Sequence, residues 1–200
     1  MGCDCGGQGG SQDSGHWESK LFFEFVRILE ECKPKYFLLE NVKMKQEYQD
    51  IISEHLGVKP IEINSSLVSA QNRKRLYWTN IPNVTQPEDK RILLKDILIQ
   101  PGTPYCYSTS GRGNGVVEFR ESSNEKAHCL TATGYTNRSF SGVKYNGDTN
   151  KLLVEECERL QTVDEGYTKG ISNTQRYKML GNGWTVDVIA HIFKELKCLK

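Results

Sequence analysis

The sequence lacks several features that would place it at once in a large class of proteins. No apolar run in its 200 residues approaches the ~20 residues that a membrane-spanning helix needs. The N-terminus has no basic stretch followed by an apolar core, so no secretory signal is visible. No internal repeat is present. These absences predict a cytoplasmic protein without membrane contacts.

The chain also lacks an excess of charge and a disulfide pattern. It has 26 basic and 25 acidic residues, a formal charge of +1, which permits a local basic patch but does not by itself indicate nucleic acid. Seven cysteines, an odd number, are scattered along the chain and predict reduced thiols rather than a disulfide framework. The composition, 37% hydrophobic and 26% charged, is ordinary for a globular domain.

Four segments give the chain its expected organisation. Residues 1–16 are rich in Gly, Ser and Gln, and we expect them to be disordered or loop because they bury too little apolar surface. Residues 17–84 alternate predicted helices and strands. Residues 85–150 are poorly periodic and predict a small irregular subdomain with short strands such as "HCLTAT". Helix patterns return over residues 151–200.

The segment 17–84 is typical of an α/β fold. Apolar residues at helical spacing predict a helix that starts at the N-cap Ser19 and stops before Pro34. A strand over 36–39, a helix ending at Gly57 and a strand in "KPIEINSSLV" follow. Strand, helix and strand with short joints predict a right-handed parallel crossover.

Polar residues end the apolar strand in "KYFLLENV". Glu40 and Asn41 stand at its carboxyl end, which in a doubly wound sheet opens into the ligand crevice. Both side chains are therefore placed to meet a substrate. The structural alternative is that Asn41 caps the following helix.

Two further segments combine residues suited to binding. In "QNRKRLYW", Gln71, Arg73 and Arg75 alternate, so in an extended chain they point to one face, where two guanidiniums suit phosphate or carboxylate recognition. A solvated basic edge strand is the alternative. In "MLGNGWTVDVIAHIF", residues 181–183 predict a tight turn before a helix whose first amides can receive a polar ligand. A plain helix–helix connection is the alternative.

Taken in order, these segments resemble motifs of the cytosine-specific DNA methyltransferases that modify ring carbon 5, and the match is close to the phage-type members. "FLLENV" resembles the family's Glu-Asn-Val motif, and "QNRKR" its Gln-x-Arg-x-Arg motif. "VEECERLQTVDEGYT" is similar to the segment that leads out of the target-recognition region, and "QRYKMLGNGWTVDVI" to the last motif beside the cofactor. The four motifs extend over most of residues 19–196.

The resemblance implies a partial Rossmann-like methyltransferase sheet with a small target-recognition subdomain. In this family a Cys thiolate adds to carbon 6 of a cytosine flipped out of double-stranded DNA, and carbon 5 then takes a methyl group from S-adenosylmethionine. Basic residues of the recognition region are candidates for DNA contacts, among them Arg112, Arg120 and Lys126.

The resemblance also implies roles for individual residues. Glu40 would face ring nitrogen 3 and the exocyclic amine of the cytosine, and Arg75 would hold its carbonyl oxygen. Arg73 would support that site or contact phosphate. Asn41 would bond the backbone of the loop that carries the nucleophile. The residues implied to border the cofactor are Asn182, Gly183 and Trp184.

Two parts of the family pattern have no counterpart in this sequence. Nothing upstream of Leu21 resembles the strand and Gly-rich turn that hold the cofactor. Where the nucleophile's Pro-Cys-Gln loop is expected, the chain reads "MGCDCGGQGG", in which neither Cys3 nor Cys5 follows a Pro. We therefore expect the C-terminal portion of a methyltransferase, inactive alone.

Three accounts fit this pattern. The gene is truncated or frameshifted, or the chain is one half of a split enzyme completed by an N-terminal methyltransferase chain, or Cys3 or Cys5 is a relocated nucleophile. The first two are favoured, since an unanchored thiol is a poor catalyst.

Other interpretations remain beside the enzymatic one. The residues Cys3, Cys5 and His16 suggest zinc, but the spacing is poor and a fourth ligand is missing, so no metal is expected. His128 and Cys129 are assigned to packing. A non-catalytic DNA-binding remnant with salt-sensitive binding is the functional alternative. The expected setting is a bacterial or phage-infected cell, in restriction–modification or in protection of phage DNA.

Overall fold

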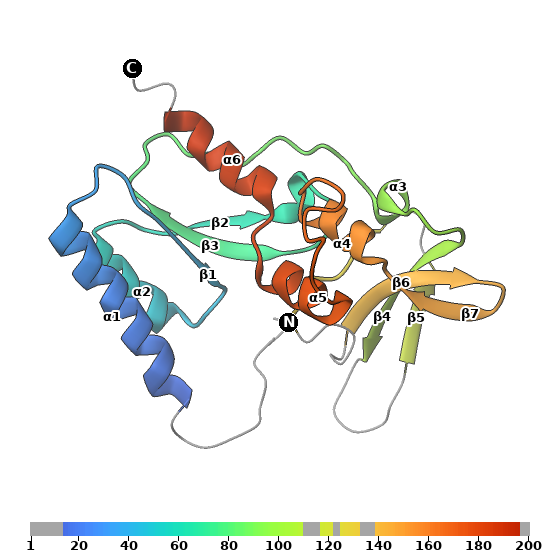
Figure 1. The fold of residues 1–200 in the computed structure, drawn as a ribbon. Helices are drawn as coiled ribbons and strands as arrows, with labels where there is room; N and C mark the ends of the chain where they lie inside the picture. Colours follow the sequence, from blue (N-terminus) through green and yellow to red (C-terminus); the bar gives the residue numbers. More distant parts are fainter. Residues whose placement is uncertain (1–13, 110–116, 122–124, 133–138, 197–200) are drawn as a thin grey trace.

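Figure 1 shows the computed structural model of the chain, which describes residues 14–109, 117–121, 125–132 and 139–196. The sequence predicts that residues 1–16 are disordered or loop. Residues 1–13 of this segment lie outside the described part of the chain. From Ser14 onward the chain is helical, so the last three residues of that segment belong to the first helix.

A three-stranded sheet forms the first half of the molecule. Its strands are β1 (Leu38–Val42), β2 (Ile61–Asn64) and β3 (Lys74–Thr79), in the order β1-β3-β2. Both β1 and β2 pair antiparallel with β3. The predicted parallel crossover is therefore wrong in its pairing, although β1 and β2 run in the same direction. The strand with the longest buried run, β3, takes the centre, where both faces are covered.

Helices cover the two faces of this sheet separately (Figure 1). On one face, Leu76 and Trp78 of β3 pack with Ile52 of α2 (Gln46–Leu56). On the opposite face, Tyr77 packs with Val188 and other apolar residues of α6 (Val186–Lys194). Successive side chains of a strand alternate between faces, so one strand supplies both cores.

The helix ends follow the sequence signals in part. α1 (Ser14–Cys32) begins earlier than predicted, and Ser19 lies inside the helix rather than at its N-cap. α2 ends at Gly57 as predicted, with φ of 66°, a left-handed conformation that glycine adopts at little cost.

Residues 103–151 contain a second, antiparallel sheet that is more regular than the sequence indicated. Its strands β4 (Thr103–Thr109), β5 (Val117–Glu121), β6 (Ser139–Tyr145) and β7 (Asp148–Lys151) lie in the order β5-β4-β6-β7. Every residue of β7 is exposed, so no apolar alternation marks it in the sequence. In the predicted strand "HCLTAT", the described residues 128–132 form no strand; next to them, Ala127 forms an isolated bridge with Gln71.

Helices at the C-terminus lie where their patterns predicted them. α4 (Val154–Leu160) and α5 (Asn173–Asn182) precede α6. A third core joins Leu160 and Leu180 of these helices to Val143 of the second sheet. A short helix, α3 (Leu94–Ile97), contributes to the same core, and a 3-10 turn, η1 (Ser65–Leu67), follows β2.

A buried carboxylate fixes the loop between α4 and α5. Glu158 is fully buried and accepts hydrogen bonds from the backbone of Gly166 and Thr168 and from the side chain of Arg176. Burial raises the pKa of this carboxyl, but the hydrogen bonds outweigh it and lower the pKa of Glu158 to about 2.

We expect Glu158 to make stability depend on pH in the acid range. In the unfolded chain its carboxyl protonates near 4.5, and in the folded chain only near 2. Its contribution is therefore complete above about pH 4.5 and is lost as the pH falls towards 2. Urea unfolding over this range should show a flatter profile for Glu158→Gln. Glu165→Gln, whose side chain is 55% exposed, is the control, and equal slopes in both variants would contradict the assignment.

Candidate active site

The register of β1 and β3 brings Glu40 and Arg75 together. Val42 lies opposite Arg75 and Glu40 opposite Tyr77, so Glu40 and Arg75 are diagonal neighbours on one face. Nε of Arg75 lies 2.9 Å from Oε1 of Glu40, and the two side chains are 15% and 18% exposed. β1 runs from Leu38 to Val42, so Glu40 is the middle residue of the strand, and the prediction that it follows the end of a strand over 36–39 is wrong. The partly shielded ion pair therefore stands within the sheet.

Asn41 belongs to the other face of the same strand. Its Oδ1 accepts a hydrogen bond from the backbone N–H of Val42 at 2.8 Å. The next helix begins at Gln46 after the N-cap Lys45, so the alternative that Asn41 caps it is wrong. The implied contact with the nucleophile loop concerns residues 1–13, which lie outside the described part of the chain.

Arg73 is buried and bonded to the protein itself. Its guanidinium donates to the carbonyl oxygens of Leu130 at 2.8 Å, Gly181 at 3.1 Å and Gly183 at 2.8 Å. It also donates to Sγ of Cys129 at 3.2 Å. Burial lowers the pKa of this group. Of the two implied roles, this geometry favours support of the site over contact with phosphate.

Gln71 anchors the same row of side chains. Its Nε2 donates to the carbonyl of Leu160 at 2.7 Å, and its Oε1 accepts from the backbone of Leu130 at 3.3 Å. Gln71, Arg73 and Arg75 thus point to one face, as the alternation predicted. The alternative of a solvated edge strand is wrong, because Gln71 and Arg73 are buried and β3 is central.

Gly181 allows two segments to pass each other closely. A Cβ at this position would lie 2.2 Å from the carbonyl carbon of Thr131 and 2.4 Å from the backbone nitrogen of Ala132. Gly181 and Asn182 form the last turn of α5, and the N–H of Gly183 caps the helix on Met179. The predicted tight turn over 181–183 is therefore mostly the end of a helix.

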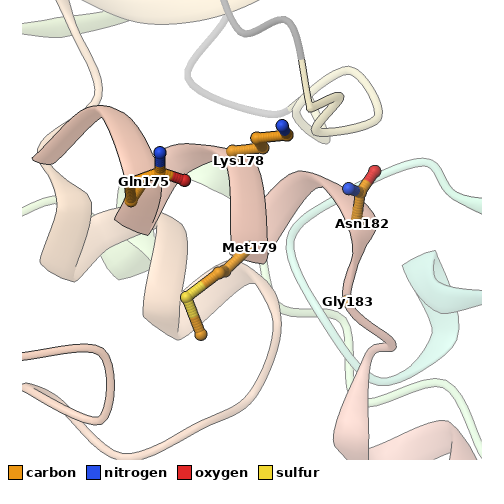
Figure 2. A pocket seen from close by; sticks show the side chains of 5 residues that line it. All are labelled: Gln175, Lys178, Met179, Asn182 and Gly183. Atoms are coloured by element: carbon orange, nitrogen blue, oxygen red, sulfur yellow. The ribbon is translucent and has the colours of Figure 1, made fainter. Parts of the chain in front are cut away.

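An open surface cavity of about 440 Å³, lined by residues of α5 and its C-cap alone, lies beside this helix end (Figure 2). Asn182 and Gly183, two of the three residues implied to border the cofactor, line it. The third, Trp184, does not; its Nε1 donates to Oε2 of Glu40 at 3.3 Å. Sequence reasoning missed this contact, since nothing local links residues 40 and 184. The lining residues are Gln175, Lys178, Met179, Asn182 and Gly183.

The thiols of the described residues differ in their surroundings. Cys129, which we assigned to packing, lies 3.2 Å from Nη1 of Arg73 and 3.7 Å from Nη2 of Arg75. Burial raises the pKa of the Cys106 and Cys157 thiols, which makes them poor nucleophiles. Cys3 and Cys5 lie outside the described residues.

Among the basic residues named for DNA contacts, Lys126 is bonded to backbone carbonyl groups of the protein itself. Its Nζ donates to the carbonyl oxygens of Ser66 at 2.6 Å and Ser69 at 3.0 Å. It therefore ties residues 125–132 to η1. Arg112 and the side chain of Arg120 lie outside the described part.

The model of the C-5 cytosine-specific DNA methylase family matches residues 5–91 and 45–198 of the chain. This chain belongs to that family. Its members use S-adenosylmethionine as methyl donor. The matched ranges include both strands that carry the ion pair and the helix end beside the cavity.

Curated relatives of this DNA methylase are bacterial type II methyltransferases. M.NlaX of Neisseria lactamica is 27% identical over 88% of this chain and 67% of its own length. M1.ScrFI of Lactococcus lactis is 28% identical over 88% and 55%, and M.HhaI of Haemophilus parahaemolyticus is 25% identical over 94% and 69%. The chain thus spans between 55% and 69% of the length of these relatives.

Solved methyltransferase structures share the fold. A prophage-encoded DNA modification methyltransferase from E. coli superposes with a TM-score of 0.65 at 14% identity, over 92% of this chain and 74% of that one. The S. pombe Dnmt2 methyltransferase gives 0.58 at 17% identity, over 91% and 73%. At these identities the likeness concerns the fold of the methylase alone.

The described part of the chain offers neither a membrane span nor a metal cluster. None of the helices within the described ranges is both long and apolar enough to cross a bilayer. The His, Cys, Asp and Glu side chains described there form no group of three suited to a metal ion. The zinc alternative rests on Cys3, Cys5 and the side chain of His16, which lie outside these ranges.

We expect Arg73→Met to destabilise the methylase fold by roughly 3 kcal/mol, because one buried and two partly buried carbonyl groups lose a charged donor. Lys74→Met, at the exposed neighbouring position, should stay within about 0.5 kcal/mol of the parent. Urea unfolding of the two variants makes the comparison. Similar losses in both would show that the buried bonds contribute little.

Proposed function

We propose that this chain carries the base-binding part of a DNA cytosine-5 methyltransferase that acts on a cytosine flipped out of double-stranded DNA. The observation that carries the proposal is the shielded ion pair of Glu40 and Arg75 in a member of this family. Residues 17–84 and 151–200 form the catalytic part in this proposal, and residues 85–150 recognise the target. The setting is the cytoplasm of a bacterial or phage-infected cell.

Glu40 and Arg75 offer groups complementary to one edge of cytosine. The carboxyl of Glu40 meets ring nitrogen 3 and the exocyclic amine, and the guanidinium of Arg75 meets the carbonyl oxygen. When a thiolate adds to carbon 6, negative charge grows on the ring. A proton held at nitrogen 3 by Glu40 and the positive charge of Arg75 stabilise it. Because both side chains are mostly shielded, water screens these charges weakly.

The open cavity beside α5 offers side chains that suit one wall of the cofactor site. Asn182 and Gln175 supply amide donors and acceptors, Met179 supplies an apolar wall, and Lys178 supplies a cation for a carboxylate. When bound, S-adenosylmethionine supplies the electrophilic methyl group.

In this proposal the nucleophile comes from a part of the enzyme that is N-terminal in sequence to the segments described above. We place the attacking thiol on a complementing N-terminal methyltransferase chain, with Cys3 as the candidate within the present sequence. Asn41 lies next to Glu40 and would bond the backbone of the loop that carries this thiol. Arg73 supports the site through its bonds to Gly181 and Gly183.

We expect Glu40→Gln and Arg75→Ala to lower methyl transfer from labelled S-adenosylmethionine to duplex DNA by at least about 100-fold. The reason is that each removes a charge that acts on the cytosine ring. Lys43→Ala removes an ion pair with Glu62 whose side chains are 63% and 35% exposed, and it should leave the rate unchanged.

The assay is run with the chain alone and with a complementing chain. Equal rates in Glu40→Gln and the parent would refute the role proposed for this carboxyl group. Salt-sensitive DNA binding without transfer under either condition would support the non-catalytic remnant instead.

The exposed side of the molecule next to β1 is the observation that supports a complementing chain. Over residues 20–32 of α1 and throughout β1 no side chain is buried, in contrast to β3. Among the described strands β1 pairs with β3 alone, so its other edge carries no strand. A sheet edge of this kind readily accepts a further strand.

α1 also leaves apolar side chains exposed, and Phe25 of the same helix contacts Phe37, the residue before β1. Phe23 contacts His55 and so turns towards α2. Leu21 and Ile28, seven positions apart, lie on the opposite flank of the helix and are 75% and 48% exposed. We propose that these two residues and the free edge of β1 receive the chain that supplies the part of the relatives' length to which this sequence does not align.

We expect Leu21→Lys/Ile28→Lys to abolish co-purification with the part of M.NlaX that does not align with this chain. The reason is that two charges would enter an apolar contact. The matched control is Tyr167→Lys/Ile171→Lys, at residues 72% and 46% exposed, which should co-purify like the parent. Equal thermal midpoints of the two variants verify folding, and unchanged co-purification of the first would refute this surface.

A further inference from the structure

The two oxygens of the Glu40 carboxylate contact different parts of the chain, one through an ion pair and one through a hydrogen bond. Oε1 lies 2.9 Å from Nε of Arg75 on β3. Oε2 accepts from Nε1 of Trp184, between α5 and α6, at 3.3 Å. A carboxylate has about four acceptor sites, so the two contacts fix its orientation and leave capacity on both oxygens for a ligand.

Trp184 reaches Glu40 because its neighbours in the chain are anchored. The carbonyl of Gly183 accepts from Arg73 at 2.8 Å and from Nε2 of Gln161 at 3.3 Å. On the other side, Oγ1 of Thr185 donates to Oε1 of Gln161 at 3.0 Å. Gln161 and Thr185 are each 1% exposed. The backbone that carries the indole is therefore held by buried groups.

Trp184 neither lines the cavity nor belongs to a hydrophobic core. It is 46% exposed as a residue and belongs to none of the three cores. The cavity is lined by its neighbours Asn182 and Gly183 and not by Trp184. The most specific contact of this side chain is the one between its N–H and Glu40.

We propose that Trp184 is a positioning residue for Glu40. Its indole N–H holds one carboxylate oxygen while Arg75 holds the other, which turns the remaining lone pairs towards the base. The inference deepens the proposed function and rests on it wherever the base is concerned. Residues 182–184 contain both the cavity-lining Asn182 and Gly183 and the donor Trp184. In this proposal the segment therefore connects the cofactor site to the base-binding site.

The first experiment tests the contact without any ligand. In the ¹⁵N-labelled chain, the indole N–H resonance of Trp184 is assigned with Trp184→Phe. Glu40→Gln replaces a charged acceptor by a neutral one, so this proton resonance should move to lower chemical shift. The indole of Trp78 donates to Ser53 at 3.0 Å and is the internal control. A Trp184 resonance that does not respond to Glu40→Gln overturns the proposal, whatever the protein's activity.

The second experiment distinguishes positioning of Glu40 from contact with the cofactor. Trp184→Phe keeps a ring and removes the donor. The probes are S-adenosylmethionine and a duplex with one cytosine opposite an abasic site, which lowers the cost of extrusion. The same duplex with that cytosine replaced by a second abasic site is the control.

We expect the affinity for the cytosine duplex to fall about tenfold in Trp184→Phe, since a hydrogen bond to a charged group is lost. The affinities for the control duplex and for S-adenosylmethionine should not change. Weaker cofactor binding with an unchanged cytosine preference would assign Trp184 to the cofactor wall and overturn the proposal. If the parent itself does not distinguish the two duplexes, the proposed function fails, and the indole resonance still decides whether Trp184 holds Glu40.

Discussion

The buried guanidinium of Arg73 is the interaction on which the rest of the site depends. It joins the residue before β3 to two segments that lie far away in the sequence, at Leu130 and at Gly181–Gly183. Cys129 is the neighbour of Leu130 in the chain, and Trp184 is the neighbour of Gly183. Cys129 and Trp184 lie beside Arg75 and Glu40 only because their backbones are held in place. A charge used in this way must be surrounded by acceptors, which explains its nearly complete burial.

Two arginines of one extended segment, Arg73 just before β3 and Arg75 within it, have different tasks. Arg73 is 4% exposed and its bonds end on the protein's own carbonyls. Arg75, two positions later, lies nearer the surface and pairs with a carboxylate that keeps free acceptor sites. The two side chains are chemically identical, and the difference comes from how deeply each one is buried. One alternating row of side chains thus runs from a buried supporting residue to a partly shielded ion pair.

Local patterns in the sequence predicted the features that local geometry decides. The shared face of Gln71, Arg73 and Arg75 follows from the alternation of a strand, and the end of α2 follows from Gly57. Strand order could not be predicted in this way, because the central place of β3 depends on how the whole sheet buries its apolar surface. β7 carries no apolar pattern at all. The contact between Glu40 and Trp184 depends on Arg73 and Gln161, which hold the neighbours of Trp184 from distant parts of the chain.

The narrow crossing at Gly181 has a consequence for how such a protein can change over evolutionary time. There is no room for a methyl group between this position and the backbone of Thr131 and Ala132. Residues 125–132 are further pinned through Lys126 and Leu130. The fully exposed β7 bears no comparable restriction. Within the proposed function, a lineage would acquire a new target by recombination with breakpoints outside this crossing, while the base-binding half is inherited unaltered.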